Sequence, residues 1–225
     1  MLDETNRVFP TAKLDKADIH YAYAGIRPLP KREKGPESAI TRKHIIFKHK
    51  NEAKGLVSII GGKLTTFRNL AEQAVDAAIK QAGLPAEKCT TRSLPLPGAV
   101  DLREATEHLT QSAVLSPECI ERLLGIYGSC ARDIVALQKT EFADVYIDAD
   151  RTVLAAEVAF AVRNEFAVSL VDIMHRRMMI GLNSDQGLPM ADKIASIAAS
   201  VAGWDKVERN RQLQALHDYC SRFKP

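Results

Sequence analysis

Several features that would assign a function at once are missing from the sequence. The four cysteines form no Cys-x-x-Cys pair and no Cys/His ligand spacing, so neither a zinc site nor an iron–sulfur cluster is predicted. No apolar run reaches the length of about eighteen residues that a membrane span needs, and Met1-Leu2-Asp3-Glu4 does not start a signal peptide. We expect free thiols, no metal and a cytoplasmic protein.

The chain also has little excess of either positive or negative charge. The net charge is +3 over 225 residues, which gives no case for nucleic acid as a partner. The run Lys31-Arg32-Glu33-Lys34 makes the amino-terminal third locally basic, and it indicates either a solvated loop or a contact for an anionic ligand or a membrane head group. Aromatic residues make up 6% and hydrophobic residues 46%, enough for a core of closely packed helices.

Periodicity divides the chain into a short strand-rich part and a longer helical part. Alternating residues predict strands over 19–26, 43–48 and 55–60, and a helix from Thr65 or Thr66 to about Gln81 ends at Gly83. Helices are then expected over 101–111, 117–139, 151–180, 190–202 and 205–222. The predicted fold is mainly α, a helical bundle preceded by a small antiparallel β segment and one helix, α+β overall. We divide it into residues 1–83, a proline-rich linker over 84–100, and a helical domain over 101–225.

The junction between the last predicted strand and the first predicted helix is the best candidate for a ligand-binding site. Gly61 and Gly62 let the backbone pass close to a ligand, and a helix start with unpaired N–H groups follows directly. Lys63 adds a full positive charge at the positive end of the helix dipole. This pattern favours a phosphate or a flavin ring, although a plain tight turn with a solvated lysine also fits it.

The amino-acid sequence of this junction resembles that of a known protein family. Residues 61–72, Gly-Gly-Lys-Leu-Thr-Thr-Phe-Arg-Asn-Leu-Ala-Glu, resemble the last flavin-contacting motif of FAD-dependent glycerol-3-phosphate dehydrogenases. Residues 23–29, with Arg27, resemble the family's Gly-Val-Arg-Pro-Leu strand, and residues 157–167 followed by Asp172 resemble the long helix of its carboxy-terminal domain. The resemblance covers the chain from about Asn6 to its end.

The resemblance implies hydride transfer from sn-glycerol 3-phosphate to FAD, giving dihydroxyacetone phosphate. It implies that Arg27 and Lys63 bind the substrate and that the cofactor contacts Gly61, Gly62, Lys63, Leu64 and Thr65. No catalytic base is assigned. Residues 1–83 then correspond to the end of the FAD/substrate domain, and residues 101–225 to the helical carboxy-terminal domain.

No strand–Gly-x-Gly-x-x-Gly–helix unit occurs in the chain. We therefore expect the carboxy-terminal portion of such an enzyme, inactive alone, whose first partner is an amino-terminal FAD domain. A homo-oligomer, and peripheral contact with the cytoplasmic membrane through a quinone acceptor, are left open, as is oxygen in place of quinone.

One alternative comes from a different functional class, a non-catalytic helical interaction module for self-association or partner docking. A large exposed apolar surface on the strands at 19–26 and 55–60 would favour the enzyme fragment, and a closed surface would favour the module. Glu165 and Asp172, seven residues apart, resemble a catalytic carboxylate pair, but a structural network with Arg163 and Arg176 is the stronger interpretation.

Overall fold

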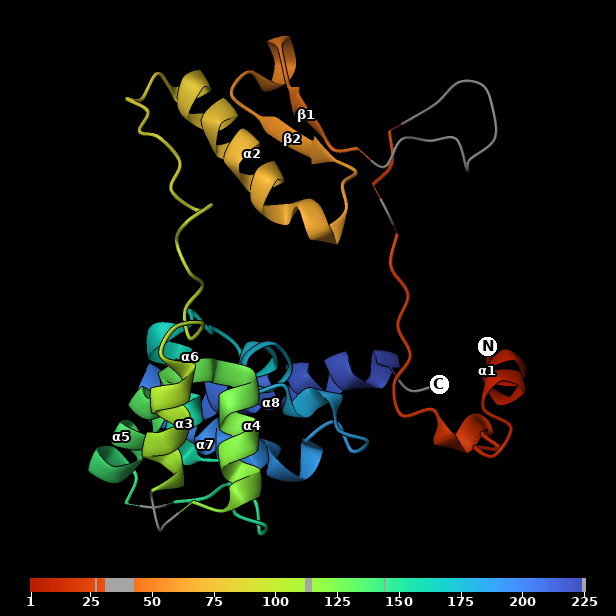
Figure 1. The fold of residues 1–225 in the computed structure, drawn as a ribbon, viewed down its shortest axis with the longest axis vertical. Coiled ribbons are helices and arrows are strands. Elements are labelled where there is room, and N and C mark those ends of the chain that lie inside the picture. The colour runs from red at the N-terminus through yellow and green to blue at the C-terminus, as the bar shows by residue number, and fades with distance from the viewer. Residues whose placement is uncertain (27, 31–42, 112–114, 144, 224–225) are drawn as a thin grey trace. The chain divides into compact units, whose positions relative to one another are not determined.

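The computed structural model describes residues 1–225 except 27, 31–42, 112–114, 144 and 224–225. The chain forms two compact units: Met1–Tyr23 with Leu96–Pro225, here the helical unit, and Ala24–Pro95, here the hairpin unit. The predicted class is confirmed, because the structure is mainly helical with one small antiparallel sheet (Figure 1). The division at 84–100 stays a prediction.

The hairpin unit consists of two short strands and one helix. Strands β1 (Ile45–Lys48) and β2 (Val57–Ile60) pair antiparallel, with Ile45 opposite Ile60, and the 3-10 turn η3 (Asn51–Ala53) lies between them. Helix α2 (Phe67–Ala82) packs against both strands, after the 3-10 turn η4 (Leu64–Thr66). It ends where the sequence predicts, because Gly83 takes a left-handed φ of +67° and its N–H donates to the carbonyls of Ile79 and Lys80.

The helical unit contains the buried core. Its α-helices are α1 (Leu2–Val8), α3 (Leu102–Thr110), α4 (Pro117–Tyr127), α5 (Ala131–Glu141), α6 (Ala155–Asn164), α7 (Ala191–Ala202) and α8 (Lys206–Cys220). Its 3-10 turns are η1 (Lys16–Asp18), η5 (Gly128–Cys130), η7 (Ile180–Leu182), η8 (Leu188–Met190) and η9 (Ser221–Phe223). The segment η6 (Asp172–Arg177) is a π-helix. Helix α6 is buried along most of its length and packs on α5 and α7. It therefore takes the central position that its apolar sequence predicts.

The single helix expected over 151–180 is wrong. Helix α6 ends at Asn164, and Phe166 takes a left-handed φ of +56°. A new helical segment then starts at Leu170, after Ser169, because the Asp172 carboxylate accepts hydrogen bonds from the backbone N–H and the hydroxyl of Ser169, at 3.0 and 2.8 Å. This reciprocal Ser-x-x-Asp cap interrupts the apolar run.

The helix expected over 117–139 is also divided. Ser116 caps α4 as predicted, by accepting the N–H of Cys119 at 3.2 Å, and Pro117 occupies the first turn. Gly128 then takes a φ of +57° and packs against Gly98, whose carbonyl accepts the N–H of Ser129 at 3.0 Å. This contact ends α4 and attaches the end of the predicted linker to the helical unit.

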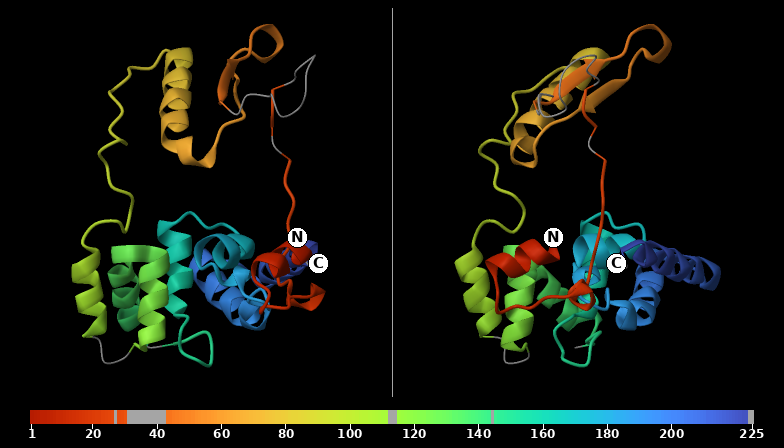
Figure 2. Two further views of the ribbon diagram at one scale, coloured as in Figure 1. Left: turned by 45° about the vertical axis from the view of Figure 1, so that its right-hand side comes forward. Right: turned by 90° about the vertical axis from the view of Figure 1, so that its right-hand side faces the viewer.

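The strand expected over 19–26 is absent. These residues are extended but form no sheet, and the backbone N–H of Ala22 donates instead to the carbonyl of Phe223 at 3.1 Å. Alternation alone makes a strand only where a neighbouring strand offers an open edge. The amino-terminal segment lies beside the carboxy-terminal end of the helical unit instead (Figure 2).

Candidate functional site

The strand–Gly-Gly–helix junction forms as the sequence predicts. Gly61 and Gly62 both take positive φ values, +74° and +107°, which residues with a Cβ rarely adopt. A Cβ on Gly62 would lie 3.1 Å from Cδ1 of Leu70, so glycine also permits close packing on α2. The carbonyl of Lys63 accepts the N–H and the hydroxyl of Thr66, both at 3.0 Å, and this fixes the turn η4.

The side chains of this turn face solvent. Lys63, Leu64 and Thr65 are exposed, Leu64 at 89%, and among the described residues Lys63 has no ion-pair partner. A free ammonium, a backbone open to close approach and the amino-terminal end of a helix together fit one end of a flavin or a phosphate. They do not supply the adenosine and pyrophosphate site. Arg27, the second predicted substrate residue, lies outside the described residues.

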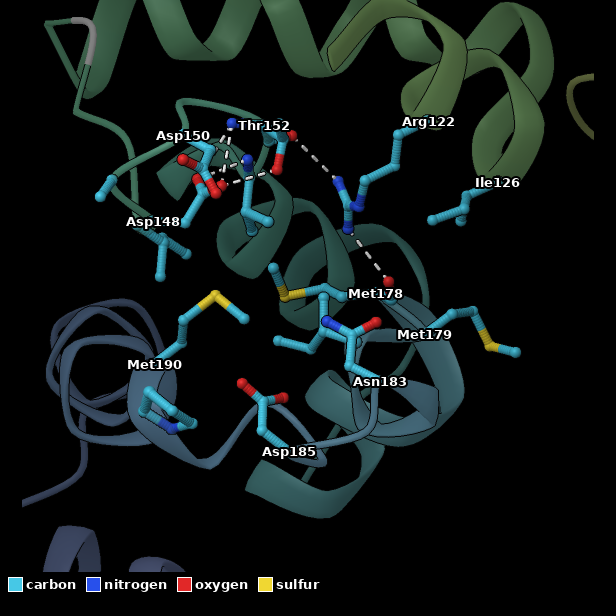
Figure 3. Close-up of a pocket in the computed structure, with 15 residues that line it drawn as sticks. Arg122, Ile126, Asp148, Asp150, Thr152, Met178, Met179, Asn183, Asp185 and Met190 are labelled. Carbon is cyan, nitrogen blue, oxygen red and sulfur yellow. Dashed lines mark hydrogen bonds between the residues drawn. The ribbon is translucent and has the colours of Figure 1, made fainter. Parts of the chain in front are cut away.

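A separate cavity of about 690 Å³ opens in the helical unit, and sequence reasoning did not predict it (Figure 3). Its lining comes mainly from the loops over 147–153 and 178–190, with Arg122 and Ile126 from α4. Asp148 accepts the N–H and hydroxyl of Thr152 and the N–H of Val153. Burial raises the pKa of Asp148, but these hydrogen bonds outweigh it and hold the pKa below its ordinary value.

Arg122, the arginine that lines this cavity, forms a buried ion pair with Glu157. Arg122 donates to both carboxylate oxygens of Glu157 at 2.8 Å and to the carbonyl of Met178 at 3.0 Å. Glu157 also accepts the hydroxyl of Tyr127 at 3.0 Å and the N–H of Leu154 at 2.8 Å, which caps α6. Burial raises the pKa of Glu157 against the opposing effect of Arg122. These contacts hold the two loops in place, which is a structural role.

The expected network around Glu165 and Asp172 does not include Arg163, which pairs with Glu141 instead. Asp172 is used as a helix cap and pairs with Arg176, so the structure does not bring it together with Glu165 as a catalytic pair. In the part of the chain that the structure describes, no group of histidines, cysteines and carboxylates is arranged to hold a metal ion. The four cysteines form no disulfide with one another. Of the helices in the described ranges, none has the length and apolarity to cross a bilayer.

Comparison with known proteins defines the class of the molecule. The chain belongs to the family described as the C-terminal domain of alpha-glycerophosphate oxidase, whose model matches residues 89–209. The glycerol-3-phosphate dehydrogenase of Synechocystis sp. is 35% identical and matches 97% of this chain and 40% of its own length. The mitochondrial glycerol-3-phosphate dehydrogenase of Arabidopsis thaliana is 32% identical over 94% of this chain and 36% of its own. The chain thus spans about 40% of the length of these curated relatives.

A solved structure shares the fold. The glycerol-3-phosphate dehydrogenase from Bacillus halodurans, complexed with FAD, matches all of this chain and 44% of its own length, with a TM-score of 0.76 and 24% identity. The likeness to an enzyme family, stated above from residues 23–29, 61–72 and 157–167, is therefore confirmed at the level of family and fold.

Proposed function

We propose that the chain is the carboxy-terminal portion of a flavin-dependent sn-glycerol-3-phosphate dehydrogenase and completes its active site. The observation that carries this is the positive-φ pair Gly61 and Gly62 leading into Lys63, which is exposed at a helix start and forms no ion pair with the described residues. The relatives named above, which match nearly the whole chain, are glycerol-3-phosphate dehydrogenases.

In this proposal FAD supplies the hydride acceptor when it is bound. The glycine pair lets the backbone approach the ring, and the start of η4 and α2 directs its dipole at developing negative charge. Lys63 holds the substrate phosphate, together with Arg27. The general base and the dinucleotide site belong to the amino-terminal partner, so the chain alone neither binds FAD tightly nor turns over substrate.

The apolar surface of the hairpin unit supports an enzyme fragment over a self-sufficient interaction module. Ile26 is 99% exposed, and Leu56 and Ile59 are about half exposed. Exposed apolar groups in a unit whose described residues form a two-stranded sheet are suited to contact with further strands. We further propose a cytoplasmic enzyme that contacts the membrane surface peripherally and forms a homo-oligomer, with either quinone or oxygen as the electron acceptor.

A chimera tests the proposal directly. The part of the Synechocystis relative that this chain does not match is joined to this chain, and flavin absorbance and glycerol-3-phosphate-dependent dye reduction are measured. We expect retained flavin and activity, and a rise in KM of about 10- to 100-fold for Lys63→Ala, the cost of one charged hydrogen bond. Lys88→Ala, another exposed lysine, is the matched control.

Two outcomes contradict the proposal. Equal kinetics for the Lys63 and Lys88 variants would remove Lys63 from the site. Tight FAD binding by this chain alone, followed by flavin fluorescence, would mean that the turn is a complete site and that the chain is not an incomplete portion.

A further inference from the structure

The cavity of the helical unit carries an excess of negative charge. The charged residues of its lining are Arg122, Asp148, Asp150 and Asp185. Arg122 donates to both carboxylate oxygens of the buried Glu157, so its charge is balanced within the wall of the cavity. The three aspartates have no cationic partner in the lining. The cavity is no part of the glycine turn, and the proposed dehydrogenase function leaves it unused.

Two basic side chains close to this cavity in the fold make contacts elsewhere. The ammonium of Lys193, on α7, donates to the carbonyls of Tyr146 and Ile147. The guanidinium of Arg151 lies over the ring of Tyr146, 4.3 Å from its centroid. Neither Lys193 nor Arg151 belongs to the lining of the cavity. A positively charged ligand therefore meets three carboxylates there and competes with no lysine of the lining.

The polar groups lie on opposite sides of the cavity rather than in one cluster. Asp148 and Asp150 come from one loop, and Asn183 and Asp185 come from the other, across the cavity (Figure 3). The side chains of Asp150 and Asn183 form no hydrogen bond or ion pair with the described residues. Asp185 uses Oδ1 to accept the N–H of Gly187 at 2.8 Å, which leaves Oδ2 for a ligand. Each side of the cavity thus offers carboxylate oxygen to a cation.

Apolar side chains separate the two polar sides. Met178 and Met190 lie between the loop of Asp150 and the loop of Asp185 in Figure 3, and Ile147 adds to the apolar lining. Methionine is flexible and polarizable, so its side chain adapts to an aliphatic chain of variable conformation. The cavity therefore presents acidic, apolar and acidic regions in succession.

We propose that this cavity binds a linear aliphatic diamine, with one ammonium at Asp150, the other at Asp185, and the methylene chain on the methionines. A metal ion does not fit this order, because the carboxylates of the described residues are not grouped as metal ligands. A monoamine would use only one of the two acidic sides. A diamine pairs with both sides and covers the apolar surface between them. This binding is independent of the proposed dehydrogenase activity.

Isothermal titration calorimetry on the full chain tests the proposal. The ligands are unbranched diamines from 1,3-diaminopropane to 1,8-diaminooctane, each compared with the monoamine of equal carbon number. We expect saturable binding of one diamine per chain, an affinity that passes through a maximum with chain length, and a preference of about fivefold over the matched monoamine, the effect of one further exposed ion pair. Absence of saturable binding, equal affinity for diamine and monoamine, or an affinity that only rises with chain length would overturn the proposal.

Two substitutions assign the ends of the ligand. Asp150→Asn and Asp185→Asn should each weaken binding of the preferred diamine about fivefold and remove its advantage over the monoamine. Both side chains are exposed, so neither change disturbs the core. Asp133→Asn, an exposed position on α5 outside the lining, changes the net charge equally and should leave the affinity unchanged. Equal losses in all three variants would show attraction by net charge alone, and displacement of the diamine by equimolar magnesium would show a metal site; either result would overturn the proposal.

Discussion

The two units of the chain differ in how much each buries. Every buried residue of the described chain lies between Ala105 and Cys220, in the helical unit, and none of the described residues of the hairpin unit is buried. The helical unit holds two clusters of buried apolar side chains, one around α6, α7 and α8 and one around α4 and α5. The difference separates a part with a buried core from a part whose described residues form none.

The hairpin unit nevertheless carries the best candidate for ligand chemistry. A two-stranded hairpin is at most marginally stable by itself, and one helix packed on it adds little when no side chain is fully buried. The glycine turn at 61–62 is therefore presented by a unit whose described residues bury little apolar surface. The proposed partner domain would supply both the remaining half of the site and the missing cover.

Hydrogen exchange gives the sharpest test of this contrast. Amides of β1, β2 and α2 should exchange about a thousandfold faster than those of α6 and α7, because local opening of an uncovered hairpin costs much less than opening the core. Exchange with mass-spectrometric detection on the intact chain measures both units at once. Equal protection would mean that something covers the hairpin, and a protection that rises with chain concentration would support the self-associating module.

The helical unit should lose much of its stability if its buried ion pair is broken. Arg122→Met leaves the carboxylate of Glu157, which is 0% exposed, without its charged partner, and should lower the free energy of unfolding by about 3–5 kcal/mol. Urea unfolding followed by circular dichroism measures the change. Arg103→Met is the control, since Arg103 and Glu107 form an exposed pair, and it should leave stability unchanged. Equal effects of the two substitutions would contradict the assignment.

Close packing at the end of the linker should have the next largest effect. Gly98 has a φ of +79°, and a Cβ there would clash with the carbonyl of Tyr127, so Gly98→Ala should cost about 1–3 kcal/mol or more. Gly125→Ala, an exposed helical position in α4 with nothing nearby, should instead stabilise by about 1 kcal/mol. The same unfolding experiment compares them, and a neutral Gly98→Ala would show that the contact does not hold the linker.

Local signals predicted the elements wherever a cap or breaker coincided with the end of a pattern. Helices α2, α7 and α8 fall close to their predicted limits, because Gly83 and Gly203 take left-handed conformations at helix ends. The long helix over 151–180 was wrong because a continuous apolar pattern concealed the cap formed by Ser169 and Asp172. That Ser-x-x-Asp spacing is visible in the sequence and could have divided the helix.

The features that the sequence did not predict depend on tertiary contacts. Whether residues 19–26 pair as a strand depends on a neighbour, and here the carboxy-terminal turn at Phe223 supplies the hydrogen bond. The network of Arg122, Tyr127 and Glu157 joins residues 30 and 35 positions apart, so no local pattern could reveal it. The glycine turn was predictable because its chemistry lies within five consecutive residues.

The smallest expected effect is a pH dependence of the helical unit. The pKa of His175 is lowered by burial and by Arg176, so the unfolded chain binds a proton below about pH 6.5 where the folded chain does not. This contribution to stability is complete above that pH and is lost as pH falls, by about 1 kcal/mol over one pH unit. Glu157 and Glu165, whose pKa values burial raises, act in the opposite direction.

The measurement is therefore the difference in unfolding free energy between wild type and His175→Gln at pH 7.5 and pH 5.5. An identical slope in the His175→Gln variant and in wild type would show that His175 is not the group responsible.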